Sequence, residues 1–313
     1  MRNRLGFACV LALAMAAPAA FAAPPPPMPV YAPQLFDAYF NVAASYSRAS
    51  FGQEFLPFAI SNRGAALRGR ATFEAALAER FGAQIDGVLG HEWNSMDLSG
   101  LTIDDPTTSA TLAAHLFWRD PNVGLIGAIG QYTHNETVYD FSGSKFSLSE
   151  RNYFTGLEGQ YFLGNVTLYA QAAYRSSTLS LESESLDGNG VALAGQVRYF
   201  VDPNWLVAVK GSYDFVRYDF PDLAGVHIDI ERWTAGLRSE YRLAAMPVSV
   251  FGELTYGEKT FKGQDAFFDV SEKGPRAMVG IQYNLGTGTL QQRDRAGGSL
   301  DPFESHLSYP LFH

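Results

Sequence analysis

The sequence predicts an all-β protein: a transmembrane, antiparallel, up-and-down β-barrel of about twelve strands. Three observations lead to this fold class. Segments of about ten residues alternate apolar and polar side chains, as half-buried strands do. Abrupt turns such as Asp202-Pro203-Asn204 recur at intervals of roughly 40 residues. The links between segments are alternately short and long, which is typical of barrels that cross a membrane.

The alternation is clearest in residues 166–175, VTLYAQAAYR. Leu168 and Tyr174 fall on one face of this segment, whereas Gln171 and Arg175 fall on the other. About ten tilted residues are enough to cross the hydrocarbon layer. Comparable segments span 36–46, 68–77, 83–93, 111–118, 123–133, 152–163, 191–200, 205–215, 232–243, 248–256 and 276–285.

The short links have the chemistry of tight turns. In Asp120-Pro121-Asn122 and Asp202-Pro203-Asn204, proline presets φ and the flanking Asp and Asn tolerate a tight backbone. Leu163-Gly164-Asn165 uses glycine for the same purpose. In transmembrane barrels the short turns face the periplasm and the long loops face outward. The long polar links span 47–65, 94–109, 135–151, 176–190, 217–231 and 257–275.

The first 22 residues have the features of an export signal. Arg2 and Arg4 precede an apolar run, and Ala20-Phe21-Ala22 has the small-x-small pattern of a cleavage site. The apolar run is too short for a membrane helix, which needs about 20 residues. Cys9, the one cysteine, is removed with the signal. We expect a signal peptide at 1–22, a proline-rich spacer at 23–35, the barrel at 36–286 and a periplasmic C-terminal tail at 287–313.

Composition limits the partners and the alternative folds. The formal charge is −9, so nucleic acid is not an expected partner. A soluble propeller also repeats at about 40 residues, but it packs four short strands into each repeat. A soluble sandwich has shorter strands, of about five or six residues.

Aromatic residues stand beside the short turns. Amphipathic rings favour the membrane–water interface, so these residues predict a periplasmic aromatic girdle. Its members are Trp118, Tyr161, Tyr199, Trp205, Tyr241 and Tyr283, and Phe162 and Phe200 lie beside the same turns.

The export signal, the DPN turns, the alternating segments and the last strand-like segment, RAMVGIQYNL, resemble the porin-like outer-membrane β-barrels of Gram-negative bacteria. The resemblance covers residues 36–286. It implies a bacterial outer membrane, contact with membrane lipid and lipopolysaccharide, and insertion by the outer-membrane assembly machinery. Such barrels usually end on the final strand with an aromatic residue, but here the tail follows. The sequence leaves open whether this tail plugs the lumen.

Signatures of chemistry are weak. Barrel phospholipases use a His and a Ser two residues apart on a strand, but the one His-x-Ser motif here, His306-Leu307-Ser308, lies in the tail. Asp104-Asp105 imitates the acid pairs of barrel proteases, but adjacent acids in a loop are usually only solvated. His227, Asp229 and Glu231 share one face of an extended segment, yet polar residues at a barrel mouth need no metal. We expect no enzyme activity, catalytic residue, metal or cofactor.

The inner face carries the remaining information about function. Its positive and negative charges nearly balance, whereas strong ion selectivity requires rings of one sign. The leading hypothesis is a narrow, weakly selective channel for small hydrophilic solutes. The alternatives are a structural or surface-interaction barrel with a salt-bridged lumen and, third, an outer-membrane hydrolase. The predicted lumen-lining residues are Arg68, Arg70, Asp86, Glu158, Arg175, Arg198, Lys210, Arg232, Arg238, Glu240 and Glu253.

Overall fold

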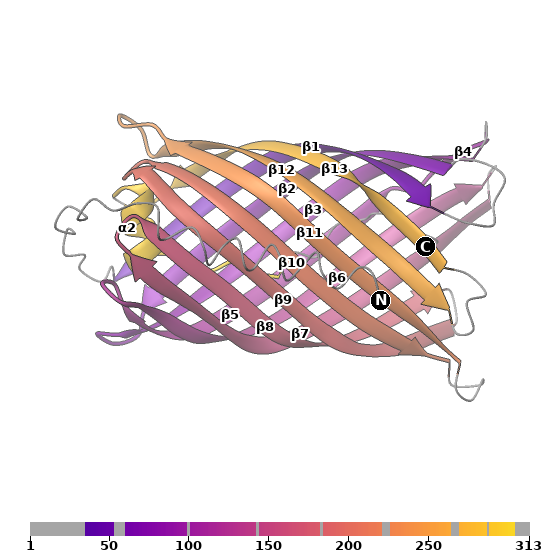
Figure 1. The fold of residues 1–313 in the computed structure, drawn as a ribbon, viewed down its shortest axis with the longest axis horizontal. Helices are drawn as coiled ribbons and strands as arrows, with labels where there is room; N and C mark the ends of the chain where they lie inside the picture. The colour runs from indigo at the N-terminus through magenta and orange to yellow at the C-terminus, as the bar shows by residue number, and fades with distance from the viewer. Residues whose placement is uncertain are drawn as a thin grey trace.

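The computed structural model describes residues 35–52, 60–98, 101–141, 144–181, 184–220, 226–263, 269–286 and 288–303. These residues form a barrel of tilted strands with one short helix inside one end (Figure 1). The strands are β1 (Phe36–Gly52), β2 (Ile60–Ala76), β3 (Phe81–Leu98), β4 (Leu101–Asp104), β5 (Thr107–Asp120), β6 (Gly124–Phe141), β7 (Ser144–Leu163), β8 (Val166–Leu181), β9 (Glu184–Asp202), β10 (Trp205–Asp219), β11 (His227–Arg242), β12 (Val248–Gly263) and β13 (Asp269–Asn284). The predicted signal peptide and nearly all of the spacer lie outside the described residues and stay predictions.

The sheet closes on itself. Each long strand pairs antiparallel with its neighbours along the chain, and β13 returns to pair with β1 from Tyr39↔Asn284 to Gly52↔Ser271. The four-residue β4 is an additional short strand, which pairs with β3 and meets β6 at Asp104↔Asp140. Without this extra strand the barrel has twelve strands, so the predicted fold class is confirmed. Closure pairs the backbone groups that an open edge would expose, which a lipid environment requires.

The residues of the short links explain why these links form tight turns at one rim of the barrel. The Asn122 amide donates to the Asp120 carboxylate at 3.0 Å, and the Asn204 amide donates to the Asp202 carboxylate at 2.7 Å. Both DPN sequences therefore form turns closed by an aspartate side chain. Gly164 has φ 55°, a left-handed conformation that favours glycine.

The strands extend further than the sequence pattern predicts. The predicted long link at 176–190 is mostly strand, since β8 continues to Leu181 and β9 begins at Glu184. In this extension Thr178 faces Asp187, and its hydroxyl donates to the Asp187 carboxylate at 2.9 Å. Beyond the lipid both faces of a hairpin meet water, so the period-two signal fades while the backbone pairing continues.

The outer surface is apolar over the middle of the barrel. Leu157 is 66% exposed there, and Leu112, Leu254 and Val279 are exposed as well. Strand β7 carries exposed Tyr153 and Tyr161 on either side of Leu157. Eight residues at about 3.4 Å each, tilted by about 40°, give a band roughly 20 Å high, close to the apolar band of membrane barrels.

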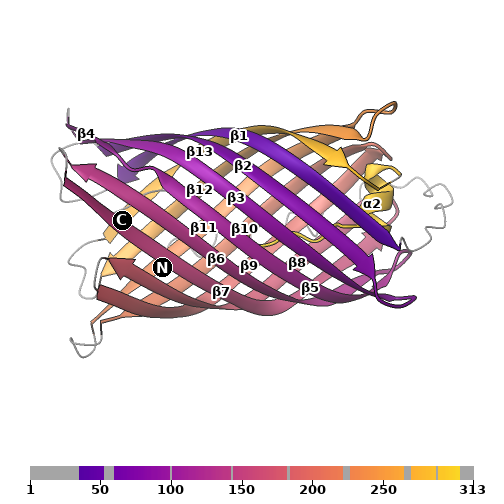
Figure 2. The same cartoon turned by 180° about the vertical axis from the view of Figure 1, so that it is seen from behind.

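The helix α2 (Leu290–Ala296) follows the last strand. Figures 1 and 2 place it at the end of the barrel opposite β4. The Thr289 hydroxyl caps its start by accepting from the Gln292 amide at 3.1 Å. Among the described residues, no helix has the length and apolar character needed to cross a bilayer.

Candidate functional site

The C-terminal segment lies inside the barrel. Residues 288–303, which we call the C-terminal plug, run from the rim of short turns into the lumen (Figure 2). Arg295 and Leu300 are fully buried, and Leu290 is 1% exposed. The described part of the predicted periplasmic tail therefore fills the lumen.

The plug docks first on the short turns. The Leu290 side chain packs against Phe200, Leu206 and Ala208. The Gln291 amide donates to the Pro203 carbonyl at 3.0 Å, and the Arg295 guanidinium donates to the Gly164 carbonyl. The repeated turns thus present backbone carbonyls to the plug.

Two aromatic residues beside these turns point inward. Phe200 is 1% exposed against Leu290, and Phe162 lies beneath the Arg295 guanidinium, 5.0 Å from the ring centroid. Their place beside the turns suggested the lipid interface, but strand parity puts them on the inner face. Both residues contact the plug and not the membrane.

Ion pairs join the plug to distant strands. Arg198 on β9 pairs with two plug carboxylates, Asp294 at 2.7 Å and Asp301 at 2.9 Å. Arg70 on β2 pairs with Asp301 at 2.6 Å. In the opposite sense, the plug's Arg293 pairs with wall residue Glu240 at 3.0 Å. These charge-assisted contacts fix the plug from several sides of the barrel.

Glutamines on the wall hold the extended part of the plug. An amide side chain carries both donors and an acceptor, so it can match an irregular backbone. Gln84 donates to the Leu300 carbonyl at 2.7 Å and accepts from the Leu300 amide at 3.2 Å. Gln171 donates to the Asp301 carbonyl at 2.5 Å, and Gln131 donates to the Phe303 carbonyl at 2.9 Å. The polar backbone of the plug is therefore paired inside the barrel.

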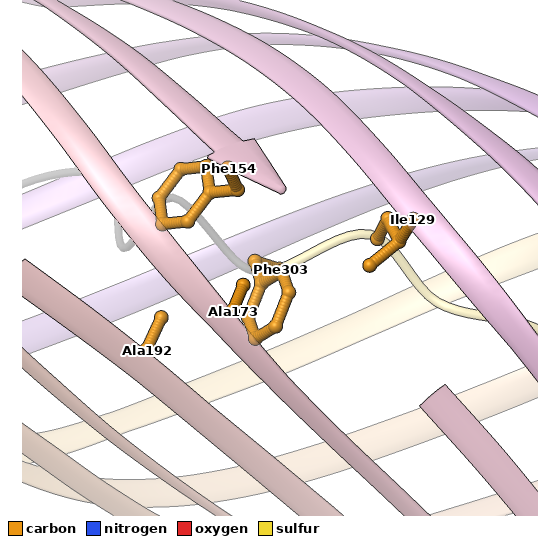
Figure 3. Packing of buried hydrophobic residues seen from close by; sticks show 5 residues of the cluster. All are labelled: Ile129, Phe154, Ala173, Ala192 and Phe303. Atoms are coloured by element: carbon orange, nitrogen blue, oxygen red, sulfur yellow. The ribbon is translucent and has the colours of Figure 1, made fainter. Parts of the chain in front are cut away.

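The end of the described chain is an aromatic stack. Figure 3 shows Phe303 beside Phe154, with Ile129, Ala173 and Ala192 around them. The Phe154 and Phe303 ring centroids are 5.4 Å apart with planes 15° from parallel. The two alanines on the neighbouring strands leave room for the ring. This stack is the apolar contact deepest along the plug.

A buried histidine supports the wall beside the plug. His115 is fully buried between two carboxylates, 3.1 Å from Asp86 and 2.7 Å from Glu158. Asp86 also accepts from Arg70 and Gln84, which both contact the plug. The cluster therefore orients side chains that hold the plug. The sequence analysis missed His115, although the alternation of side chains along β5 places it on the inner face.

A second group of charges, which we call the outer charge cluster, is formed by the buried Arg175 and the half-buried Glu150, Asp214 and Arg232. Arg175 is 1% exposed and pairs with Asp214 and, at 2.7 Å, with Glu150. Arg232 lies 3.5 Å from Glu150 and 3.9 Å from Asp214. All four residues belong to the wall, on β7, β8, β10 and β11.

Seven of the predicted lumen-lining residues line the cavity beside the plug: Arg68, Arg70, Arg198, Lys210, Arg238, Glu240 and Glu253. Of the other four, Asp86 and Glu158 contact His115, and Arg175 and Arg232 belong to the outer charge cluster. Lys210 pairs with Glu253 at 2.6 Å, and Arg238 pairs with Glu240 at 2.8 Å. Arg68 is half-buried and lines the cavity beside the plug. The sequence analysis missed the partners that the plug supplies, because residues 288–303 have no strand-like alternation.

The six predicted girdle residues face outward near the short turns. Tyr161, Tyr199, Trp205, Tyr241 and Tyr283 are exposed, and Trp118 is half-buried. The sequence analysis missed a second aromatic belt toward the other rim. Its exposed members are Tyr46, Trp93, Tyr153, Tyr174 and Tyr256.

A cavity of about 100 Å³ remains between the plug and the wall. Its wall side is formed by strands β1, β2 and β9 to β13, and its other side by plug residues including Asp294 and Asp301. A water molecule needs roughly 10–15 Å³ measured in this way, so the space holds several waters or one small solute.

Asp105, between β4 and β5, is an unusual group at the barrel mouth. It is fully buried, and its carboxylate oxygens accept no hydrogen bond from any residue that the structure describes. Burial, with the nearby negative charges of Glu92 and Asp104, raises the pKa of Asp105 to about 8. This carboxyl is therefore largely protonated at neutral pH.

The weaker candidate sites are not assembled. Asp229 pairs with Arg217 at 2.6 Å and Glu231 pairs with Lys262 at 2.9 Å, so these acids have cationic partners. Over the described ranges, no group of His, Cys, Asp and Glu is arranged to hold a metal ion. His306-Leu307-Ser308 lies outside the described residues.

No family model matches the chain, and no curated protein matches it in sequence. Solved structures to which it is similar include outer-membrane barrels. The translocator domain of the autotransporter NalP from Neisseria meningitidis is 13% identical, with a TM-score of 0.49 over 78% of this chain and 88% of that one. An outer-membrane channel from Pseudomonas putida F1 is 14% identical, with a TM-score of 0.49 over 83% and 99%. A Pseudomonas aeruginosa FadL homologue is 12% identical, with a TM-score of 0.46 over 81% and 91%.

Proposed function

We propose that this barrel is a channel for small hydrophilic solutes in a bacterial outer membrane and that the C-terminal plug closes it. The observation that carries the proposal is the way the plug is held. Besides the apolar contacts of Leu290, Leu300 and Phe303, ion pairs and hydrogen bonds hold it to a polar wall, and in the described chain it continues from the end of β13. Polar contacts can be exchanged for water, so the plug can leave while tethered.

At several positions, charged side chains of the wall keep a wall partner when the plug leaves the lumen. Arg70 keeps Asp86 at 2.8 Å when Asp301 leaves, and Arg238 continues to pair with Glu240 when Arg293 leaves. Arg198 loses both of its plug carboxylates but keeps the Gln196 side-chain oxygen at 3.1 Å. A wall with retained partners avoids much of the cost of uncompensated buried charge.

Conductance in a planar bilayer tests this function. Asp301→Ala removes the plug carboxylate that Arg70, Arg198 and Gln196 share. We expect the parent barrel to be mostly closed and the open probability of the variant to be about tenfold higher or more, because each charged hydrogen bond contributes about 1.5–3 kcal/mol.

The matched control is Asp229→Ala, which also removes one carboxylate and one arginine partner but lies at the opposite rim. It should leave the conductance of the parent unchanged. A folded Asp301→Ala barrel that stays silent would contradict the channel proposal.

The second candidate is a structural or surface-interaction barrel. The outer charge cluster favours it, because ion pairs between charges on neighbouring wall strands serve rigidity. On this hypothesis neither parent nor Asp301→Ala conducts, and the plug is a permanent part of the core. We propose no catalytic role on either hypothesis, since buried His115 is engaged by two carboxylates.

We also propose that the barrel is oriented in the outer membrane with the rim of short turns, where the plug enters, toward the periplasm. Ser185 is exposed at the opposite rim, and Asn204 lies in a short turn. We expect Ser185→Cys on intact cells to react with a membrane-impermeant thiol reagent and Asn204→Cys to react only after the envelope is opened. The reverse pattern of labelling would overturn the orientation.

A further inference from the structure

The outward face of β1 and β2 changes from apolar to cationic near the rim opposite the short turns. On β1, Val42 and Tyr46 are exposed, and Arg48 is the next outward residue. On β2, which runs the other way, Leu67 is exposed and Arg63 lies nearer the same rim. Tyr46 belongs to the second aromatic belt, so both arginines lie just beyond the apolar band, at the level where the polar headgroups of a membrane begin.

The two arginines lie directly opposite each other, since the register pairs Arg48 with Arg63 and both side chains are exposed. Like charges in this arrangement destabilise a sheet. At the same rim, exposed Arg217 instead faces Asp229 and pairs with it at 2.6 Å. Over the described residues, no carboxylate forms an ion pair with Arg48 or Arg63, so in the barrel alone an ion pair does not offset their repulsion.

A third cation extends this pair. Lys273 on β13 is exposed and faces Ser50 of β1, so the three cations occupy the adjacent strands β2, β1 and β13 (Figure 2). Carboxylates of the outward face lie at the two flanks, where Glu258 faces Lys273 from β12 and Asp97 faces Ser61 from β3. The three cations therefore form a positive patch on the outer wall of the barrel.

The wall beside this patch, toward the middle of the barrel, is apolar. Tyr46 and Trp93 are exposed at the belt, and Leu67 and Leu89 are exposed beyond them. An amphiphile with an anionic head suits this surface, because its head meets the arginines while its chains lie along the apolar strands. Guanidinium groups bind phosphate through two parallel hydrogen bonds. A soluble anion would gain only the head contacts, so the surface as a whole favours a phosphorylated lipid.

We propose that Arg48 and Arg63, with Lys273 beside them, bind the phosphate groups of a phosphorylated lipid of the lipopolysaccharide class in the outer leaflet. A phosphate between the two guanidinium groups replaces their mutual repulsion with two attractions. The site rests on the proposed outer-membrane location and orientation of the barrel. It goes beyond the proposed channel function and does not involve the plug.

Titration of diphosphoryl lipid A into the folded full chain tests the site. The protein is purified in detergent free of lipopolysaccharide, and native mass spectrometry counts the lipid molecules that stay bound. We expect the parent to bind diphosphoryl lipid A about tenfold more tightly than dephosphorylated lipid A, the contribution of one charged hydrogen bond. Arg48→Gln and Arg63→Gln should each lose most of this preference. Both side chains are exposed, so the variants should fold.

The matched control is Arg217→Gln, which also removes one outward arginine at this rim and should keep the preference of the parent. Equal binding of the two lipids by the parent, or an equal loss in Arg217→Gln, overturns the proposal. Binding of inorganic phosphate as tight as that of diphosphoryl lipid A also overturns it, because a soluble anion would then be the ligand. These titrations use purified protein, so the proposal fails separately from the orientation, which thiol labelling tests, and from the channel, which conductance tests.

Discussion

Two buried arginines solve the same electrostatic problem in different ways. Arg175 bridges Glu150 and Asp214, which both belong to wall strands. Arg198 bridges Asp294 and Asp301, which both belong to the plug. Each guanidinium is nearly inaccessible, with Arg175 1% and Arg198 6% exposed. The first arrangement joins the wall to itself, and the second joins the wall to the segment that we propose can leave the lumen.

The difference teaches what happens when such a bridge is removed. The carboxylates of the outer charge cluster are half-buried and fixed to β7 and β10, so they cannot move away from the site of Arg175 without unfolding of the barrel. The carboxylates of the plug can reach water by moving out of the lumen with their own segment. Removal of Arg175 is therefore expected to lower the stability of the barrel, and removal of Arg198 is expected to weaken closure of the lumen.

The largest stability effect is expected for Arg175→Ala. It leaves the half-buried Glu150 and Asp214 with the longer contacts to Arg232, at 3.5 and 3.9 Å, while Glu150 keeps the Tyr218 hydroxyl at 3.0 Å. Breaking a buried pair in this way costs about 3–5 kcal/mol. Unfolding in denaturant should detect this loss of stability. The folded fraction is read on gels from the heat-dependent shift in the mobility of the barrel. A loss below about 1 kcal/mol would mean that water reaches the cluster.

Arg198→Ala should have a smaller effect on stability and a larger effect on conductance. The cost is limited because the plug can carry Asp294 and Asp301 into water, so we expect about 1–3 kcal/mol. The open probability should rise, whereas Arg175→Ala should leave it unchanged in barrels that fold. If Arg175→Ala opened the lumen as readily, the distinction between the two arginines would be wrong.

The third effect is on the pH dependence of stability and concerns Asp105, a buried carboxyl beside like charges. Its pKa of about 8 in the folded chain is above the ordinary value of about 4. The folded state therefore keeps a proton that the unfolded state releases, so stability falls as pH rises from about 4 to 8. Asp105→Asn should reduce this fall. Unfolding temperatures of parent and variant at pH 5 and pH 9 measure it, and equal differences would contradict the assignment.

The wall was predictable from the sequence and the plug was not. Leu168 and Gln171 fall on the outer and inner faces of β8 as the alternation predicts, because a strand with one face in lipid and one in the lumen must alternate. Leu290 and Leu300 lie in a helix and an extended segment without such a pattern, so nothing local predicts their burial. One feature of the wall sequence did indicate that a chain segment fills the lumen. Inward-facing Gln84, Gln131 and Gln171 suit an irregular backbone better than an ion path.

The central claim is that the lumen opens by movement of the C-terminal plug, and a reversible lock on the plug tests it. A Cβ atom at Gly298 would lie 3.2 Å from the Thr72 methyl carbon, and in a disulfide one sulfur lies about 3 Å from the partner's Cβ. Thr72→Cys with Gly298→Cys should therefore form a disulfide between β2 and the plug. The chain's one cysteine, Cys9, lies in the predicted signal peptide.

The decisive measurement is bilayer conductance of this double-cysteine barrel in the Asp301→Ala background, before and after reduction. We expect the oxidised barrel to be silent and the reduced barrel to conduct, while the single variant Thr72→Cys in the same background conducts with or without reductant. Equal conductance in both states, with the disulfide verified by mass spectrometry, would contradict the account, because ions would then pass without movement of the plug.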